Sequence, residues 1–223
     1  MKASSTNVSA HLSGQRREHA FELTGGSLAL DFANTLDDRR RKRPREHIRD
    51  FADLLSWGRQ AGAVNSAQAT LLLRTASRNA STAQTTLRRA LVLREAIYRI
   101  FSAAAQRRAV PQSDLVLLNA AVGNAFRHLR VASAAPAAHK KRAGSAFAWD
   151  WNEDHSLDRI LWPVVRSAAE LLASEDLGRV RECAADTCGW LFLDRSKNRS
   201  RRWCDMKICG NRAKARKFYA RSL

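Results

Sequence analysis

The four cysteines of this chain all lie in its last fifth, in two pairs of equal spacing. They are Cys183-x4-Cys188 and Cys204-x4-Cys209, and the second pair runs directly into Gly210-Asn211-Arg212. Zinc in structural sites prefers tetrahedral thiolate ligation, and two such pairs separated by a hairpin-sized gap can close the site completely. We therefore predict a structural zinc site whose ligands are Cys183, Cys188, Cys204 and Cys209.

The surrounding sequence favours metal over disulfide chemistry. The first residues contain no apolar run that could serve as a signal-peptide core, and no later stretch approaches the ~18 apolar residues of a membrane-spanning helix. We expect a cytoplasmic protein, where paired cysteines indicate metal or redox chemistry. A closed site leaves no coordination position for a substrate, and the chain has no Gly-rich phosphate loop and no Ser/His/Asp arrangement. We therefore expect no enzyme.

The residues around the cysteines predict a small metal-dependent fold over 175–223. Gly189 and Gly210 each follow a cysteine, where a residue without Cβ lets the backbone curl around a metal. Short strands over 190–193 and 201–203 are expected to form a hairpin, and Asn211 is expected to cap a helix running to about residue 220. A knuckle, a hairpin and a helix predict a treble-clef-like zinc finger, stabilised mainly by zinc binding.

The charge of the chain predicts a polyanionic partner. There are 39 Lys and Arg residues against 21 Asp and Glu, a formal net charge of +18. Such a balance favours nucleic acid, with an anionic membrane surface as the alternative. From Arg195 to the C-terminus the only acid is Asp205, and the basic residues are 195, 197, 199, 201, 202, 207, 212, 214, 216, 217 and 221.

We predict that these basic residues contact nucleic acid. Ile208, Ala215, Phe218 and Tyr219 are expected to face inward on the final helix, which would leave its basic side chains outward. The predicted contacts are Arg199, Arg201, Arg202, Arg212, Lys214, Arg216 and Lys217. Phosphate contacts would supply affinity, and one or two of the arginines at 201, 202, 212 and 216 would read guanine edges. Double-stranded DNA is the favoured partner. An RNA- or ribosome-associated module and a thiol-based redox switch are the alternatives.

The chain before the finger shows mainly helical periodicity. Residues 1–20 are polar and charged and predict a flexible tail. Apolar stripes predict helices near 28–36, 48–61, 67–73, 87–101, 115–126 and 157–172. Pro163 implies that the last of these is kinked or starts near Leu161, and alternation in 128–131 and 146–151 predicts a β-hairpin. The expected fold class is α+β and predominantly helical, with a domain over 21–174 followed by the finger.

Four polar residues stand out near the front of this domain: Asp31, Asn34, Thr35 and Arg39. They can serve helix capping and a buried hydrogen-bond network, or they can line an effector pocket. The basic run 39–45, which begins with Arg39, predicts a solvated loop that could add phosphate contacts.

Two motifs carry a family resemblance. Cys204-x4-Cys209-Gly210-Asn211-Arg212, preceded by Cys183-x4-Cys188-Gly189-Trp190-Leu191-Phe192 and Asn198-Arg199-Ser200-Arg201-Arg202-Trp203, closely resembles the CGNR zinc finger family. Leu30-Asp31-Phe32-Ala33-Asn34-Thr35 resembles the Leu-Asp-Phe-x-Asn-Thr motif of the ABATE domain, which precedes this finger in stress-induced transcription regulators. The resemblance implies a bacterial regulator with a DNA-binding finger and an effector-sensing front domain. A single small finger binds weakly, so we expect a homodimer.

Overall fold

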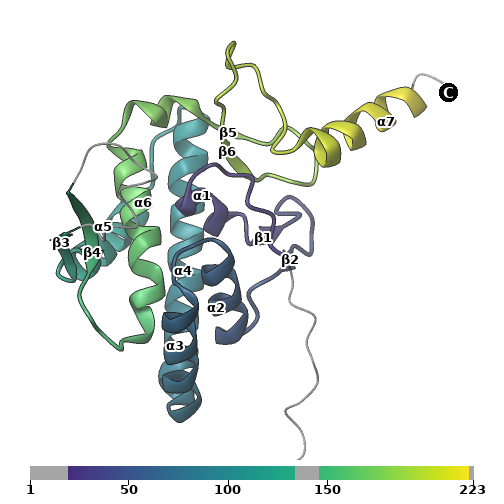
Figure 1. Ribbon diagram of the computed structural model, residues 1–223. Helices are drawn as coiled ribbons and strands as arrows, with labels where there is room; N and C mark the ends of the chain where they lie inside the picture. The colour runs from purple at the N-terminus through teal and green to yellow at the C-terminus, as the bar shows by residue number, and fades with distance from the viewer. Residues whose placement is uncertain (1–19, 134–145, 221–223) are drawn as a thin grey trace, which may run out of the picture.

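The computed structural model describes residues 20–133 and 146–220. Its longest described helix, α4 (Ala80–Ala105), runs through the helical part from end to end (Figure 1). The predicted flexible tail over 1–20 lies outside the described residues except for Ala20, and so does the part of the predicted β-hairpin loop over 134–145.

Within the described residues before the finger, five more α-helices accompany α4. They are α1 (Leu28–Ala33), α2 (Phe51–Gln60), α3 (Ser66–Arg78), α5 (Gln112–Phe126) and α6 (Trp162–Leu172). All predicted helices are confirmed, but α4 begins seven residues before the predicted Leu87. Its first turns are polar and carry no apolar stripe, and Asn79 caps them by accepting a hydrogen bond from the Thr82 amide.

The two predicted irregularities of this part are resolved by the structure. Strand β3 (Leu129–Ser133) pairs antiparallel with β4 (Phe147–Trp151), with Leu129 opposite Trp151, which confirms the hairpin. A 3-10 turn over Leu157–Leu161 (η2) precedes α6, so Pro163 lies in the first turn of that helix. Proline is tolerated there because its missing N–H would have no partner in the helix.

The basic run 39–45 connects two short strands. Strand β1 (Leu36–Asp37) pairs antiparallel with β2 (Arg45–Glu46). The run is not simply a solvated loop, because its first two residues contact the finger. The backbone amides of Arg39 and Arg40 donate to the carbonyls of Cys188 and Thr187 at 3.1 and 3.2 Å.

The finger contains a different hairpin from the predicted one. After a 3-10 turn over Glu175–Arg179 (η3), β5 (Val180–Glu182) pairs antiparallel with β6 (Leu191–Leu193). The predicted strand over 201–203 is wrong, because 201 and 202 are exposed and lie outside any ladder. The partner β5 was missed because only one of its three residues, Val180, is apolar, so it carries no recognisable strand pattern. One π-helical turn, Met206–Gly210 (η4), then leads into α7 (Asn211–Tyr219).

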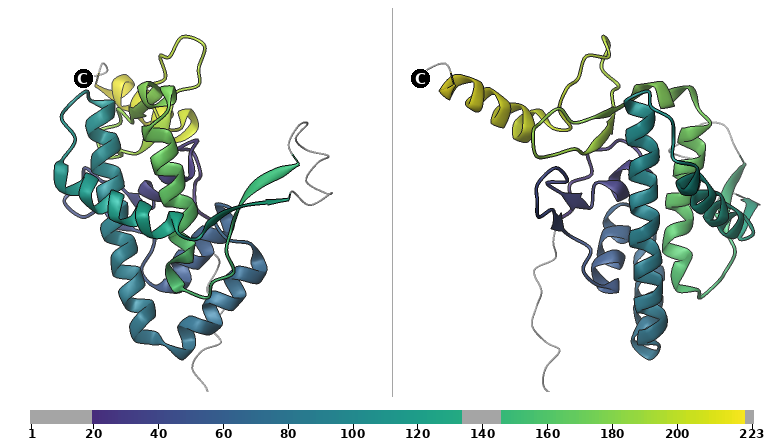
Figure 2. Two further views of the ribbon diagram at one scale, coloured as in Figure 1. Left: turned by 90° about the vertical axis from the view of Figure 1, so that its left-hand side faces the viewer. Right: turned by 180° about the vertical axis from the view of Figure 1, so that it is seen from behind.

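The hairpin β5–β6 separates two apolar cores. The larger core is formed by the buried side chains of the helices and includes Leu191 and Leu193 of β6. The smaller core contains the four cysteines together with Trp190 and Phe192. Since successive side chains of a strand point to opposite faces, the three residues of β6 serve both cores at once. The finger is therefore packed directly on the helical part, as the two views of Figure 2 show.

Polar contacts join the same two parts. The buried Asn34, just after α1, makes two hydrogen bonds with the backbone of Leu191: its Nδ2 donates to the carbonyl at 2.8 Å, and its Oδ1 accepts from the amide at 2.9 Å. Ser102 of α4 and Gln106, which caps this helix, each donate to Glu182 at 2.7 Å, and the hydroxyl of Tyr98 on α4 donates to the Gly189 carbonyl at 3.0 Å. These contacts explain how the finger is oriented on the helices.

We predict that Asn34→Ala lowers the free energy of unfolding by about 2–6 kcal/mol, because it leaves a buried amide and a buried carbonyl without partners, each worth about 1–3 kcal/mol. Urea unfolding followed by circular dichroism measures this loss. The matched control is Asn119→Ala on the exposed face of α5, which should change stability by no more than about 0.5 kcal/mol. Equal stability of the two variants would contradict the role assigned to Asn34.

Candidate metal centre and nucleic-acid interface

The four cysteine sulfurs form one compact cluster. All four sulfur atoms lie within 4.8 Å of one another, and Cys204 Sγ lies 3.6 Å from Cys188 Sγ and 3.7 Å from Cys209 Sγ. Tetrahedral zinc with Zn–S bonds of about 2.3 Å requires sulfurs about 3.8 Å apart. Each cysteine is at most 4% exposed. The cluster therefore has the donor atoms, spacing and enclosure of a closed four-coordinate metal site.

Thiols this close cannot all ionise without a cation between them. Hydrogen bonds from the thiols of Cys188 and Cys204 lower the pKa of Cys183 far below its usual value. The pKa of Cys204 is raised, because it donates to Cys183 and Cys188 and is buried. A bound metal ion removes this conflict, since a coordinating thiol is deprotonated outright.

The two pairs of cysteines reach the cluster from different elements. Cys183 follows β5 and Cys188 precedes β6, so the first pair lies in the turn of this hairpin. Gly189 has φ +73°, a left-handed backbone that glycine adopts without strain, and it returns the chain to β6. Cys204 and Cys209 flank the start of η4, where the Asp205 side chain accepts from the Ile208 amide at 3.0 Å.

Two details of the predicted helix start are wrong. Asp205, not Asn211, provides the cap, because helical backbone already begins at Met206. Gly210 has φ −64°, which any residue adopts in a helix, so conformational freedom does not explain it. Glycine at this position instead leaves room for the Met206 side chain, with which a Cβ atom would collide.

A buried aspartate organises the loop between the two halves of the finger. The carboxylate of Asp194 accepts from the Ser196 amide at 3.0 Å, from the Ser196 hydroxyl at 2.5 Å and from the Arg201 amide at 2.9 Å. Burial by itself would raise its pKa, but these hydrogen bonds lower it overall. The carboxylate is therefore ionised at neutral pH, and its contribution is lost only as the pH falls through this lowered pKa.

The basic residues of the finger lie on this loop and on the final helix. Eight exposed residues among them are together called the basic surface: Arg195, Lys197, Arg199, Arg202, Lys207, Arg212, Lys214 and Arg216. The loop and α7 project from the same end of the molecule, and α7 points away from the helical part (Figures 1 and 2). The side chain of the predicted contact Lys217 lies outside the described residues.

The predicted inward face of the final helix is wrong. Ile208 is 40% exposed, Phe218 68% and Tyr219 69%. Because α7 extends beyond the rest of the molecule, no core is available to bury its apolar side chains (Figure 1).

Four of the predicted arginines have partners within the protein. Arg202 lies over the Trp203 ring, 5.5 Å from its centroid. Arg201 stacks 4.5 Å from the Phe192 ring centroid and donates to the carbonyls of Trp203 and Cys204. Arg216 forms an ion pair with Asp186 at 2.6 Å, and both side chains are solvent-accessible. Arg212 lies beside Asp205 and Glu22 and lowers the pKa of Glu22, although desolvation raises that pKa overall.

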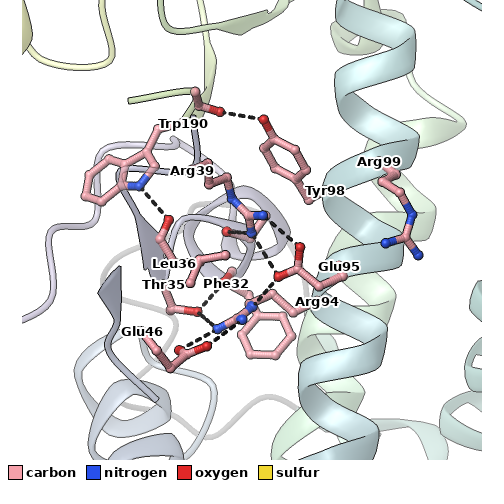
Figure 3. A network of polar contacts seen from close by, with 12 residues as sticks. Phe32, Thr35, Leu36, Arg39, Glu46, Arg94, Glu95, Tyr98, Arg99 and Trp190 are labelled. Carbon is pink, nitrogen blue, oxygen red and sulfur yellow. Dashed lines mark hydrogen bonds and ion pairs between the residues drawn. The ribbon is translucent and has the colours of Figure 1, made fainter. Parts of the chain in front are cut away.

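Two of the four predicted effector residues belong to an ion-pair network (Figure 3). Arg39 donates to both carboxylate oxygens of Glu95 at 2.8 and 3.2 Å. Arg94, whose side chain is 4% exposed, donates to both oxygens of Glu46 at 2.7 Å and to the Thr35 hydroxyl at 3.2 Å. Asn34 makes the backbone contacts to β6 described above. The buried hydrogen-bond network predicted as one of two roles therefore accounts for Asn34, Thr35 and Arg39.

Asp31 is the exception among these four residues. Together with Asn34 and Thr35 it lines a pocket of about 110 Å³. Burial raises the pKa of Asp31 to about 6, and its carboxylate accepts a hydrogen bond from the Gly25 amide at 2.7 Å. The side chain is thus a carboxyl group with few compensating contacts beside a small cavity.

The sequence analysis did not identify Glu182, which accepts hydrogen bonds from side chains of the helical part, or Asp194, which organises the loop of the finger. Glu182 is inconspicuous because its partners are far away in the sequence. Asp194 could have been recognised, since an Asp followed two residues later by Ser is typical of a turn in which the carboxylate binds the backbone.

Two family models match the chain. The model of the ABATE family, described as "putative stress-induced transcription regulator", matches residues 26–175. The model of the CGNR zinc finger matches residues 179–222. No curated protein matches the sequence. Among the described residues, no helix is both long and apolar enough to cross a membrane. The matches confirm both motif resemblances.

We predict that Asp194→Ala loosens the loop 195–200 without removing the metal site. Three hydrogen bonds to a carboxylate are lost, each worth about 1.5–3 kcal/mol, so trypsin should cleave this basic loop at least about ten times faster. Metal content per chain should stay unchanged. The control is Asp176→Ala, which breaks only an exposed pair with Arg179. Cleavage at the control rate would contradict the role of Asp194.

Proposed function

We propose that this chain, which belongs to the ABATE family and ends in a segment matching the CGNR zinc finger, is a zinc-dependent, DNA-binding transcription regulator. Neither match is to an enzyme family. The observation that carries the proposal is the basic surface, which lies on the loop that leads into Cys204 and on the segment from Lys207 to Arg216 that contains Cys209. The family supports the regulatory role, and the surface supports DNA as the target.

Zinc has an architectural role in this proposal. Cys183, Cys188, Cys204 and Cys209 would hold it, and because they fill a tetrahedral shell the ion carries out no reaction. It joins the turn of the β5–β6 hairpin to the start of the final helix. Zinc binding worth about 10–16 kcal/mol would supply most of the stability of so small a unit.

Phosphate contacts supply most of the DNA affinity. No ion pair engages Arg199, Arg202 or Lys214 within the part of the chain that the structure describes, so their charges are available to a polyanion. The pair between Arg216 and Asp186 is exposed and worth about 0–1 kcal/mol, which a phosphate can readily replace. Arg201 supports the loop through its contacts to finger carbonyls rather than binding DNA itself.

The projecting helix α7 is suited to a groove. The major groove of B-DNA is about 12 Å wide and admits an α-helix. Arg212, Lys214 and Arg216 lie on α7, so a helix in the groove would bring some of them near base edges. Homodimerisation remains part of the proposal, because two fingers would bind more tightly than one.

The regulatory input is assigned to the ABATE part. Of the residues considered for an effector, we propose only Asp31 as a direct contact, because Asn34, Thr35 and Arg39 already bond within the protein. The cavity beside Asp31 also touches Trp190 of the finger, so a small ligand there would lie at the junction of the two parts.

We predict that binding to random duplex DNA weakens steeply with salt. If about five phosphates are neutralised, the logarithm of affinity falls against the logarithm of salt concentration with a slope of about −4.5, and Arg202→Gln should reduce the slope by about 0.9. Fluorescence anisotropy across a salt series measures both slopes. Arg78→Gln is the matched control, because it removes the same charge from α3, which lies far from α7 in Figure 1.

Three results of DNA-binding measurements on the parent protein and its variants would count against the proposal. A flat salt response would exclude phosphate contacts, and equal slopes for the two arginine variants would exclude the basic surface. A Cys204→Ser variant that binds as tightly as the parent would exclude a role for the metal scaffold. Structured RNA is the competitor to include, since stronger binding to RNA would favour an RNA-associated module instead.

A thiol-based redox switch is compatible with DNA binding and has one observation in its favour. Cys188, Cys204 and Cys209 line a crevice of about 100 Å³, which is large enough for a small oxidant to approach the sulfurs. Oxidation would release the metal and unfold the finger. Zinc release under mild peroxide, reversed by a reductant, would support this role, and unchanged metal content would exclude it.

A further inference from the structure

A second, larger pocket lies on the helical part, away from the finger. It has a volume of about 500 Å³ and lies between α4, α5 and the segment that contains η2 and the start of α6. Small-molecule sites are commonly clefts of about 300–1,000 Å³ and often lie between the helices of a bundle. By contrast, the cavity beside Asp31 is about 110 Å³. Of these two pockets, only the larger one therefore has room for an organic molecule.

The walls of this pocket are apolar and rigid. Leu93, Leu161 and Val165 are buried in the core and contribute its inner surface, and Leu117 contributes from α5. Trp162 is fixed in position, because its ring is stacked on the His128 ring with the centroids 4.1 Å apart. An apolar ligand would remove this surface from water, which is favourable by the hydrophobic effect.

The rim of the pocket is positively charged. Arg88 and Arg89, on consecutive positions of α4, line the pocket and are exposed. Across the described residues, no ion pair occupies either guanidinium. The lining includes one acid, Asp158, which already accepts hydrogen bonds from Asn124 at 2.9 Å and from Ser156. Two arginines against one acid leave an excess positive charge beside an apolar cavity.

We propose that this pocket binds a small amphipathic carboxylate. Its hydrocarbon body would lie against Leu93, Leu117 and Val165, and its carboxylate would accept hydrogen bonds from Arg88 and Arg89. The planar guanidinium suits this head group, since it can donate two parallel hydrogen bonds to one carboxylate. A highly charged phosphate compound fits poorly, because most of the lining has nothing to offer its polar groups.

The site also has a defined relation to the finger. The pocket-lining arginines lie in the first half of α4, and the residues of α4 that contact the finger, Tyr98 and Ser102, lie in its second half. Binding in the pocket does not require DNA binding, so the proposal stands independently of the function proposed above.

The test compares three probes with the same chain and different head groups, namely octanoate, octylamine and octanol. Each is titrated into the full-length zinc-loaded protein in a calorimeter. Octanoate should bind saturably to one site, and octylamine should bind at least about ten times more weakly because its charge is repelled by the arginines.

Two variants locate the site. Replacing both arginines, Arg88→Gln with Arg89→Gln, should weaken octanoate binding about tenfold or more and leave octanol binding unchanged. Ala121→Trp on α5, which fills the cavity, should abolish binding of both ligands. The matched control is Arg74→Gln with Arg78→Gln, which removes the same charge from the exposed face of α3. Circular dichroism checks that each variant is folded.

The proposal is overturned by any of three results. Octanoate that binds no more tightly than octanol would show that the arginines do not select a carboxylate. Equal octanoate binding by the double arginine variant and by its control would exclude Arg88 and Arg89 as the carboxylate contacts. A folded Ala121→Trp protein that binds octanoate as tightly as the parent would place the ligand elsewhere.

Discussion

The three residues of β6 must satisfy two cores at the same time. Leu191 and Leu193 pack among the helices, and Phe192 packs with the cysteines on the opposite face. The strand can do this only if its register with β5 is fixed, since a shift by one residue would exchange the two faces. Asn34 contributes to fixing that register through its two hydrogen bonds to Leu191. The position of everything beyond β6 depends on this strand.

This arrangement gives the metal site an influence beyond the finger. The cluster fixes the turn of the hairpin and the start of the final helix, while the hairpin itself is part of the helical core. The basic surface therefore has a defined position relative to the ABATE part. In such an architecture a change among the helices can alter how the basic surface is presented without any flexible linker.

The sequence predicted what local patterns encode. Cysteine spacing predicted the cluster, apolar periodicity predicted the helices, and the two motifs predicted both families. What it could not supply are contacts between distant segments. Nothing local distinguishes Asn34 as a partner of Leu191, 157 residues away, from Asn34 as an effector ligand. The inward face expected for Phe218 and Tyr219 failed for a similar reason, because an amphipathic pattern does not say whether a neighbouring core exists.

The metal site and the helices are parts of one packed structure joined by β6. Hydrogen exchange measured by mass spectrometry on zinc-loaded and metal-stripped protein tests this arrangement most directly. Stripping the metal should remove protection not only from residues 183–220 but also from α1 and from the second half of α4, where Tyr98 and Ser102 contact the finger. Loss of protection confined to residues 183–220 would contradict this arrangement and would identify the finger as an independent unit.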